Sequence, residues 1–193
     1  DKKILISPHE IGGQMQLMAS NLRKKGFFAT SMCYSQDWQK YVADIQINLH
    51  LKKKWYHKQY SKLIFTIWAA NNYDIFHFFW GQSLFGLKFH PHLDLILLKK
   101  LKKKIFVHFR GIDVVDLAYF DYLYEKNINE NIEEPDISRK DQLRSINLWK
   151  KYANKILISE PDLFKIVPDS IMVQQTIDMK YWDSQHNLEN KKI

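Results

Sequence analysis

Short apolar runs alternate with amphipathic stretches along almost the whole chain, and this alternation limits the fold more than any other feature. The apolar runs have the length and composition of buried strands, and they lie at 4–7, 27–33, 74–79, 105–109, 156–159 and 171–173. Helical stretches are expected between them at about 51–71, 93–103, 138–152 and 161–166. Strands that alternate with helices form a parallel sheet with helices on both faces.

The first of these units shows the pattern most clearly. The run at 4–7 ends in a loop that contains Gly12 and Gly13, and hydrophobic residues then recur at helical spacing as far as a basic segment closed by Gly26. Six strands joined by right-handed crossovers predict an α/β, Rossmann-like doubly wound parallel sheet with the strand order 3-2-1-4-5-6. No element is assigned to 34–50. The acidic stretch 114–137 is expected to be a long loop or lid.

Length and cysteine content narrow the class of protein further. With 193 residues, of which 46% are hydrophobic, the chain is expected to form one globular domain. Its one cysteine, Cys33, lies within the apolar run 27–33 and is expected to be a buried small hydrophobe. An internal disulfide is therefore excluded. Redox and zinc chemistry are not expected, and no metal site or cofactor is assigned.

The charge of the chain bears on its partners. The net charge of +8 and the isoelectric point near 9.3 indicate an anionic partner, which is nucleotide phosphate, an acidic membrane surface or nucleic acid. Nucleic acid is not expected, because no recognised binding motif is present. No apolar run reaches the roughly eighteen residues of a membrane-spanning helix, and the chain opens with a strand pattern rather than a signal peptide. A soluble, cytoplasmic protein is expected.

The loop after the first apolar run is the first candidate site. Ligands of doubly wound sheets bind beyond the carboxyl ends of the strands. Gly12 and Gly13 allow a ligand to approach the backbone, and they open a helix whose N–H groups and dipole favour phosphate. His9 and Glu10 precede them as candidate ligand-binding side chains. The dinucleotide pattern G-x-G-x-x-G is absent, and a simple tight turn is the alternative reading.

The loop after the run 74–79 is the second candidate site. It follows an aromatic strand and presents Trp80, Gln82 and Ser83. Such groups suit a sugar, because aromatic faces pack on its C–H surfaces while amides and hydroxyls hydrogen-bond its oxygens. The alternative is that Trp80 belongs to one alternating aromatic face of the strand. His77 is expected to be a core histidine with its hydrogen bonds satisfied.

The loop after the run 105–109 is the third candidate site, since it delivers Arg110, Gly111 and Asp113 to the same edge of the sheet. The guanidinium group can hold a phosphate or a carboxylate, and Asp113 can accept a hydrogen bond from a sugar hydroxyl or orient Arg110. The alternative is an ion pair of Arg110 with Asp113 that ties the turn. His108 is expected to point into the helical cover of the sheet.

Taken in this order, the segments resemble the amino-terminal domain of family 4-type glycosyltransferases of the GT-B fold, particularly bacterial enzymes that build capsule, lipopolysaccharide or related surface glycans. The resemblance spans nearly the whole chain. The segment 175–178 is similar to the Asn-Pro-Ile-Asp segment of the family, with its first two positions changed. The other matching segments are Gly12-Gly13 before a helix, Tyr73-Asp74-Ile75-Phe76-His77-Phe78, Arg110-Gly111-Ile112-Asp113-Val114 and Ser159-Glu160-Pro161-Asp162-Leu163.

The resemblance implies an enzyme, a retaining glycosyltransferase with a nucleotide-sugar donor, a sugar or lipid-linked acceptor and no obligatory metal. It implies that 1–178 is the acceptor-binding domain and that 179–193 is a polar tail or linker. In the family the linker leads to a carboxy-terminal domain that binds most of the donor, and this chain is expected to lack that domain. The chain alone is therefore expected to be inactive, as a fragment or as one subunit of a split enzyme.

The resemblance also implies roles for individual residues. Arg110 and Asp113 are expected to be catalytic, and Gly12 and Gly13 are expected to face the donor diphosphate. Many family members carry histidine at the position of Arg110, so the chemistry of this loop differs here. The residues expected on the acceptor side are His9, Glu10, Trp80, Gln82 and Ser83.

The segment 45–73 is basic and aromatic, with five lysines and no acidic residue. This pattern suits an anionic membrane interface, and it predicts peripheral binding to the inner face of the plasma membrane. The alternative is a helix that packs its aromatic side chains on the sheet and leaves its lysines in solvent. The residues expected to contact the membrane are Lys52, Lys53, Lys54, Trp55, Lys58 and Lys62.

Two other functions remain open from the sequence. The first is a non-catalytic membrane-docking subunit that works with a separate catalytic partner, which the basic segment favours. The second is half of a GT-B-type nucleotide-sugar epimerase, which requires histidines and carboxylates for proton abstraction and elimination. The aromatic loop at Trp80 favours sugar transfer over epimerisation.

Overall fold

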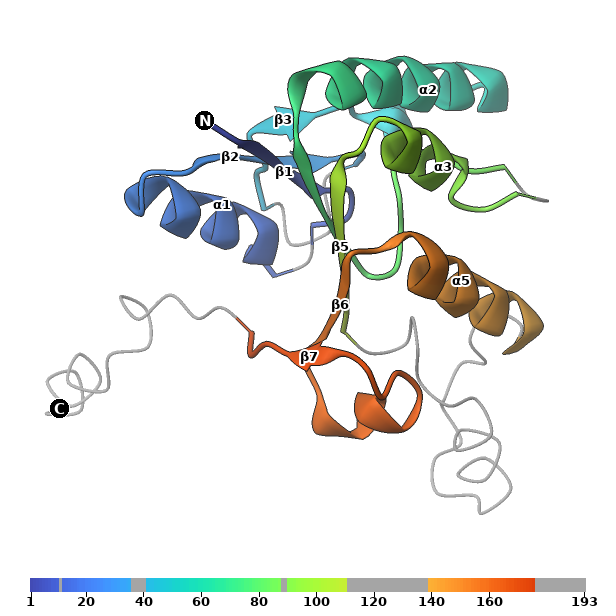
Figure 1. Cartoon of the computed structure of the whole chain (residues 1–193). Helices are drawn as coiled ribbons and strands as arrows, with labels where there is room; N and C mark the ends of the chain where they lie inside the picture. The colour runs from blue at the N-terminus through green and yellow to red at the C-terminus, as the bar shows by residue number, and fades with distance from the viewer. Residues whose placement is uncertain (11, 36–40, 88–89, 111–138, 176–193) are drawn as a thin grey trace, which may run out of the picture.

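The computed structural model of the chain describes residues 1–10, 12–35, 41–87, 90–110 and 139–175 (Figure 1). The predicted loop 114–137 and the tail 179–193 lie outside the described residues. The strands are β1 (Lys3–Ser7), β2 (Phe28–Cys33), β3 (Ile45–Gln46), β4 (Ile75–Phe79), β5 (Lys104–Phe109), β6 (Lys155–Ile158) and β7 (Ile171–Met172). The helices are α1 (Gln14–Lys24), α2 (Trp55–Asn72), α3 (Leu93–Lys100) and α5 (Arg139–Tyr152), with short 3-10 helices η1 (Leu49–Leu51) and η2 (Pro161–Lys165).

The described strands form one parallel sheet in the order β3-β2-β1-β4-β5-β6-β7. This confirms the predicted α/β, doubly wound, Rossmann-like class. The placement of one strand was wrong, because the order 3-2-1-4-5-6 applied to the six predicted runs puts 74–79 beside 27–33. In the structure β4 pairs with β1, and the third position is taken by the two-residue strand β3. Such a short strand leaves no periodic signal in the sequence.

Helices cover both faces of the sheet, as predicted. Figure 1 shows α1 on one side and α2, α3 and α5 on the other. The larger core lies under α2, α3 and α5, where Phe76, Phe78 and Trp149 are fully buried. The smaller core lies under α1 and includes Met15 and Cys33, which confirms that the cysteine is a buried small hydrophobe.

The helix boundaries follow from local sequence, with two differences from the prediction. The residues predicted to form a helix over 161–166 form the 3-10 helix η2 instead. The segment before Pro168 is too short for a regular α-helix. The helix predicted from residue 51 begins at Trp55, after η1 and an extended Lys54. Within the described part of the chain, no helix is both long enough and apolar enough to span a bilayer.

The side chains of α2 agree in full with neither the predicted membrane contacts nor the alternative of aromatic residues packed on the sheet. The alternative in which the aromatic side chains pack on the sheet is wrong for Trp55 and Tyr60, which are 67% and 66% exposed. Lys58 and Lys62 are only partly exposed, and the Lys62 ammonium lies 5.2 Å from the ring centroid of Tyr34. Burial, followed by the charge of Lys58, lowers the pKa of Lys62. The predicted membrane contacts at Lys58 and Lys62 are therefore not on the outer surface of the helix.

Candidate functional site

The predicted site segments meet at the carboxyl edge of the sheet, in a set of residues that we call the exit rim. Its members follow β1, β4, β5 and β6, which are consecutive neighbours in the sheet. The chain leaves β1 for α1 on one face and leaves β4 for α3 on the other, so β1 and β4 flank the point where the winding reverses. The exit rim comprises His9, Glu10, Gly12, Gly13, Trp80, Gly81, Gln82, Ser83, Arg110 and Ser159. Gly111 and Asp113 lie outside the described residues.

Glu10 is held by the first turn of α1. Its carboxylate is buried, with Oε1 accepting a hydrogen bond from the Met15 amide at 3.2 Å and Oε2 from the Gln16 amide at 2.9 Å. A side-chain carboxylate satisfies these N–H groups and complements the helix dipole. The prediction that Glu10 binds the acceptor is therefore corrected to a structural role. It also means that a donor phosphate cannot use these two amides while Glu10 holds them.

The two glycines after Glu10 have different surroundings. Both adopt the left-handed conformation, with φ of 65° at Gly12 and 73° at Gly13, which accounts for glycine at each position. A Cβ at Gly13 would lie 3.0 Å from the ring of Tyr41, whereas a Cβ at Gly12 would meet nothing within 4 Å. Gly12 and His9 are exposed. The backbone at Gly12 is therefore the open side of this loop.

Replacement of Glu10 tests its role as the cap of α1. Glu10→Ala is expected to lower the free energy of unfolding by about 1–2 kcal/mol, because two amides of the first helical turn lose their acceptor. Glu10→Gln keeps one carbonyl acceptor and is expected to cost less. Urea unfolding followed by circular dichroism measures both. Equal stability of the wild type and Glu10→Ala would contradict this assignment.

The loop after β4 is fixed by hydrogen bonds in an uncommon conformation. Trp80 and Gly81 both have positive φ, at 59° and 57°, and a tryptophan in this region is strained. The Trp80 amide donates to the carbonyl of His108 at 3.0 Å, and the Trp149 indole donates to the carbonyl of Gly81 at 2.8 Å. These bonds hold the turn. The side chain of Gln82 is exposed.

The indole of Trp80 is a candidate ligand donor. Its ring packs against the core under α1, and its Nε1 is buried with no hydrogen-bond partner among the described residues. A buried N–H group without an acceptor is costly unless a ligand or water supplies one. Trp80 and Gln82 therefore remain candidates for ligand binding.

Ser83 belongs to a network that ties its loop to α3 and α5. Its hydroxyl donates to Asp94 Oδ1 at 2.6 Å and lies 3.0 Å from Nδ1 of His92, whose Nε2 lies 2.8 Å from Oγ of Ser145. The other oxygen of Asp94 accepts the Leu84 amide at 2.7 Å. Because the Ser83 proton goes to the carboxylate, His92 donates to Ser83 and does not activate it as a nucleophile. The prediction of Ser83 as an acceptor ligand is corrected to a positioning role.

Burial dominates the ionisation of this network. It raises the pKa of Asp94 to about 6, against the opposing hydrogen bonds from Ser83 and Leu84. It also lowers the pKa of His92 to about 4, which leaves the imidazole neutral at neutral pH. Sequence reasoning missed both residues, because an aspartate in a first helical turn and a histidine before a helix are common local features.

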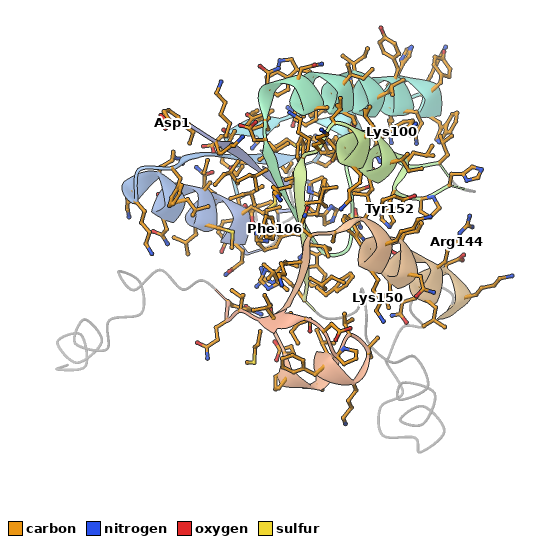
Figure 2. All side chains as sticks on the ribbon, viewed as in Figure 1. Asp1, Lys100, Phe106, Arg144, Lys150 and Tyr152 are labelled. Carbon is orange, nitrogen blue, oxygen red and sulfur yellow. The ribbon has the colours of Figure 1, made fainter. Side chains whose placement is uncertain are left out.

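Two histidines lie together on the α1 side of the sheet. His77 alternates with Phe76 and Phe78 along β4, and its ring centroid lies 5.8 Å from that of His108 on β5. Phe106 lies on the same face of β5 as His108, because side chains alternate along a strand. Figure 2 labels Phe106 on β5 and Tyr152 on α5, the helix on the other side of the sheet from α1. Nε2 of His108 lies 3.0 Å from Oγ of Ser159 at the exit of β6.

The histidine pair has unmet hydrogen-bonding capacity. Nε2 of His77 and Nδ1 of His108 are buried without a hydrogen-bond partner among the described residues, so the prediction of a satisfied His77 is wrong. Burial lowers the pKa of His77 to about 3 and of His108 to about 4, and the positive charge of Arg110 adds to both shifts. The Arg110 guanidinium lies 5.3 Å from the ring centroid of Phe79, which places a permanent cation at this end of β5.

A hollow of about 680 Å³ lies elsewhere on the molecule. Its lining includes Lys3, Phe28, Trp68 and Tyr73, which lie near the amino ends of β1 and β2 or on and just after α2. Ligands of doubly wound sheets bind at the opposite, carboxyl edge, so this hollow is not the candidate site. Within the described residues there is no cluster of three histidine, cysteine, aspartate or glutamate side chains that could hold a metal ion.

Comparison with known proteins shows no family for this chain. No family model and no curated protein matches the sequence. Among solved structures the chain is similar to an FtsZ dimer from M. jannaschii, with 13% identity and a TM-score of 0.43 over 98% of this chain and 53% of that one. An FtsZ mutant from M. jannaschii gives 13% identity and a TM-score of 0.44, with 98% and 54% covered. The chain spans about half the length of these structures.

Proposed function

We propose that this chain is the acceptor-binding, amino-terminal half of a retaining, nucleotide-sugar-dependent glycosyltransferase of the GT-B type, acting in surface-glycan synthesis. One observation carries the proposal. Three segments that the sequence resemblance assigns to substrate binding lie on neighbouring strand exits, and two of them flank the point where the sheet winding reverses. Ligands bind at this position in doubly wound sheets.

We assign acceptor binding to fewer residues than the sequence resemblance implies. Trp80 supplies an aromatic face and an indole N–H that has no hydrogen-bond partner among the described residues, and Gln82 supplies an exposed amide; such groups bind sugars. His9 is exposed at the exit of β1, the strand that pairs with β4. Glu10 and Ser83 hold the loops in place, each through its own hydrogen bonds. Acceptor recognition therefore rests on His9, Trp80 and Gln82.

The donor side of the proposed site rests on charge and backbone. Arg110 is a permanent cation at the exit of β5, and Gly12 leaves the backbone open at the exit of β1. A fixed cation stabilises the leaving diphosphate of a sugar nucleotide in a metal-independent transfer. Asp113 keeps its predicted catalytic role, and the remaining contacts to the donor would come from a carboxy-terminal domain or a partner subunit.

The epimerase alternative has less support from the described residues. Epimerisation by proton abstraction needs a carboxylate or histidine that is free to accept a proton from the substrate. Both oxygens of Glu10 accept backbone hydrogen bonds, and Asp94 is buried in the network with Ser83. Among the described residues of the exit rim, His9 is then the remaining histidine or carboxylate, so the epimerase alternative rests on His9 and on Asp113.

Saturation-transfer NMR with short-chain polyprenyl-diphosphate sugars tests the acceptor role. Trp80→Ala is expected to weaken binding about tenfold, because the stacking face and the indole donor are both lost. Gln82→Ala is expected to weaken it less, while Leu143→Ala on the exposed side of α5 serves as the matched control and should leave it unchanged. Binding that survives Trp80→Ala and Gln82→Ala at full strength would place the acceptor elsewhere and refute the proposed function.

A further inference from the structure

The outer face of α2 is an exposed apolar surface without charge. Figure 1 shows α2 at the top of the view, at one end of the layer that it forms with α3 and α5. Helices that are apolar on both faces are normally covered on both, and contiguous exposed apolar side chains mark an interaction surface. The outer face consists of Tyr56, Tyr60, Leu63, Ile64, Ile67 and Trp68, which are between 39% and 66% exposed. Their inner neighbours Phe65, Ala69 and Ala70 are buried in the core.

Lysines gather at one end of this surface. Lys52, Lys53 and Lys54 precede the first turn of α2, and the last two are exposed. The Lys54 ammonium lies 5.6 Å from the ring centroid of Tyr56, so positive charge adjoins the aromatic end of the outer face. The segment 45–73 has no acidic residue to neutralise it. The surface therefore combines an uncharged apolar stripe with a basic end.

This combination distinguishes between the partners that could cover the outer face. A second copy that docks through the same face brings the same lysines and no acidic residue from 45–73, so electrostatic repulsion opposes pairing of two outer faces. A bilayer with anionic headgroups satisfies both parts, because acyl chains take up the aliphatic side chains and headgroups pair with the lysines. Tryptophan and tyrosine at the border between the two prefer the membrane interface.

We propose that the outer face of α2, together with Lys53 and Lys54, docks the protein on an anionic lipid membrane. The helix lies in the plane of the interface, with Leu63, Ile64 and Ile67 directed into the acyl region. The predicted contacts at Lys58 and Lys62 are replaced by this apolar stripe. The inference does not rest on the proposed transferase activity, because vesicle binding is measured without donor or acceptor.

Vesicle flotation tests the docking surface. The protein is mixed with vesicles of phosphatidylcholine alone or with an equimolar mixture of phosphatidylcholine and phosphatidylglycerol. We expect flotation only with the anionic vesicles and weaker flotation at high salt. Ile64→Ser with Ile67→Ser is expected to reduce binding by more than tenfold, and Lys53→Gln with Lys54→Gln by about fivefold for each lysine.

Controls separate docking from folding and from self-association. Leu143→Ser changes an equally exposed apolar residue on α5 and is expected to leave flotation unchanged. Circular dichroism checks that each variant folds, and light scattering reports the oligomeric state. Flotation that is absent, or that is insensitive to the α2 substitutions in folded variants, overturns the proposal. A dimer that dissociates on Ile64→Ser without any vesicle binding overturns it in favour of a second copy.

Discussion

Acidification from pH 6.5 towards pH 4 is expected to destabilise this protein by several kcal/mol. Burial lowers the pKa of His77 to about 3 and the pKa values of His92 and His108 to about 4, from an ordinary value of 6.5. A group with a depressed folded pKa takes up its proton more readily when unfolded. Its stabilising contribution is therefore present above pH 6.5 and is lost as the pH falls through this window. Each histidine contributes on the order of 3 kcal/mol.

Asp94 acts in the opposite direction over part of the same range. Burial raises its folded pKa to about 6 from 3.8, so the folded protein binds this proton first and gains stability as the pH falls from about 6 to 3.8. One carboxyl group offsets roughly one of the three histidines. The net expectation is a loss of stability on acidification, measured as a falling urea midpoint between pH 6.5 and pH 4.

The pair His77→Phe and Phe106→Leu tests the source of this pH dependence. His77→Phe keeps an aromatic ring stacked on Phe79 and removes a nitrogen that has no hydrogen-bond partner among the described residues. It is expected to make the pH dependence shallower. Phe106→Leu changes packing beside His77 without removing a titrating group, so it should shift all midpoints and keep the slope. The same slope in His77→Phe as in the wild type would contradict the assignment.

Trp149→Ala is expected to lower the free energy of unfolding by about 3–5 kcal/mol. The Trp149 side chain is fully buried between α5 and the sheet, with its ring centroid 5.3 Å from Phe78 and 5.0 Å from His92. Its indole donates the hydrogen bond to the carbonyl of Gly81. The substitution removes a large apolar contact and leaves a buried carbonyl without its donor.

Trp149→Phe separates the contribution of the hydrogen bond from that of the apolar contact, and Leu143→Ala serves as the control. Trp149→Phe retains most of the apolar contact and loses the hydrogen bond, so about 1–3 kcal/mol is expected. Leu143→Ala, on the exposed side of the same helix, should change stability by less than about 0.5 kcal/mol. Trp149 also holds the turn at Trp80 and Gly81 through this hydrogen bond. Ligand binding at the exit rim is therefore expected to weaken in Trp149→Phe even under conditions in which the variant is fully folded. Unchanged stability in Trp149→Ala would show that the loop is held by other contacts.

Sequence patterns located the candidate site but did not give the roles of its residues. The loops at Gly12 and Trp80 were predicted to lie on one edge of the sheet, because parallel strands send their carboxyl ends to one edge, but only the structure makes their strands, β1 and β4, neighbours. The role predicted for Glu10 was wrong, since a carboxylate five residues before an amide can reach a ligand or the helix beside it equally well. Only the coordinates show that it binds the amides of Met15 and Gln16.

The sequence by itself determined the alternation of strand and helix, the parallel sheet and the burial of Cys33, because these depend on the local spacing of apolar residues. The tertiary structure decided what depends on residues far apart in the chain. It placed β4 beside β1, joined Ser83, His92 and Ser145 across 62 positions in one network, and left the outer face of α2 uncovered. Periodicity gives the face on which a side chain lies, whereas its partner is set by which elements pack against that face.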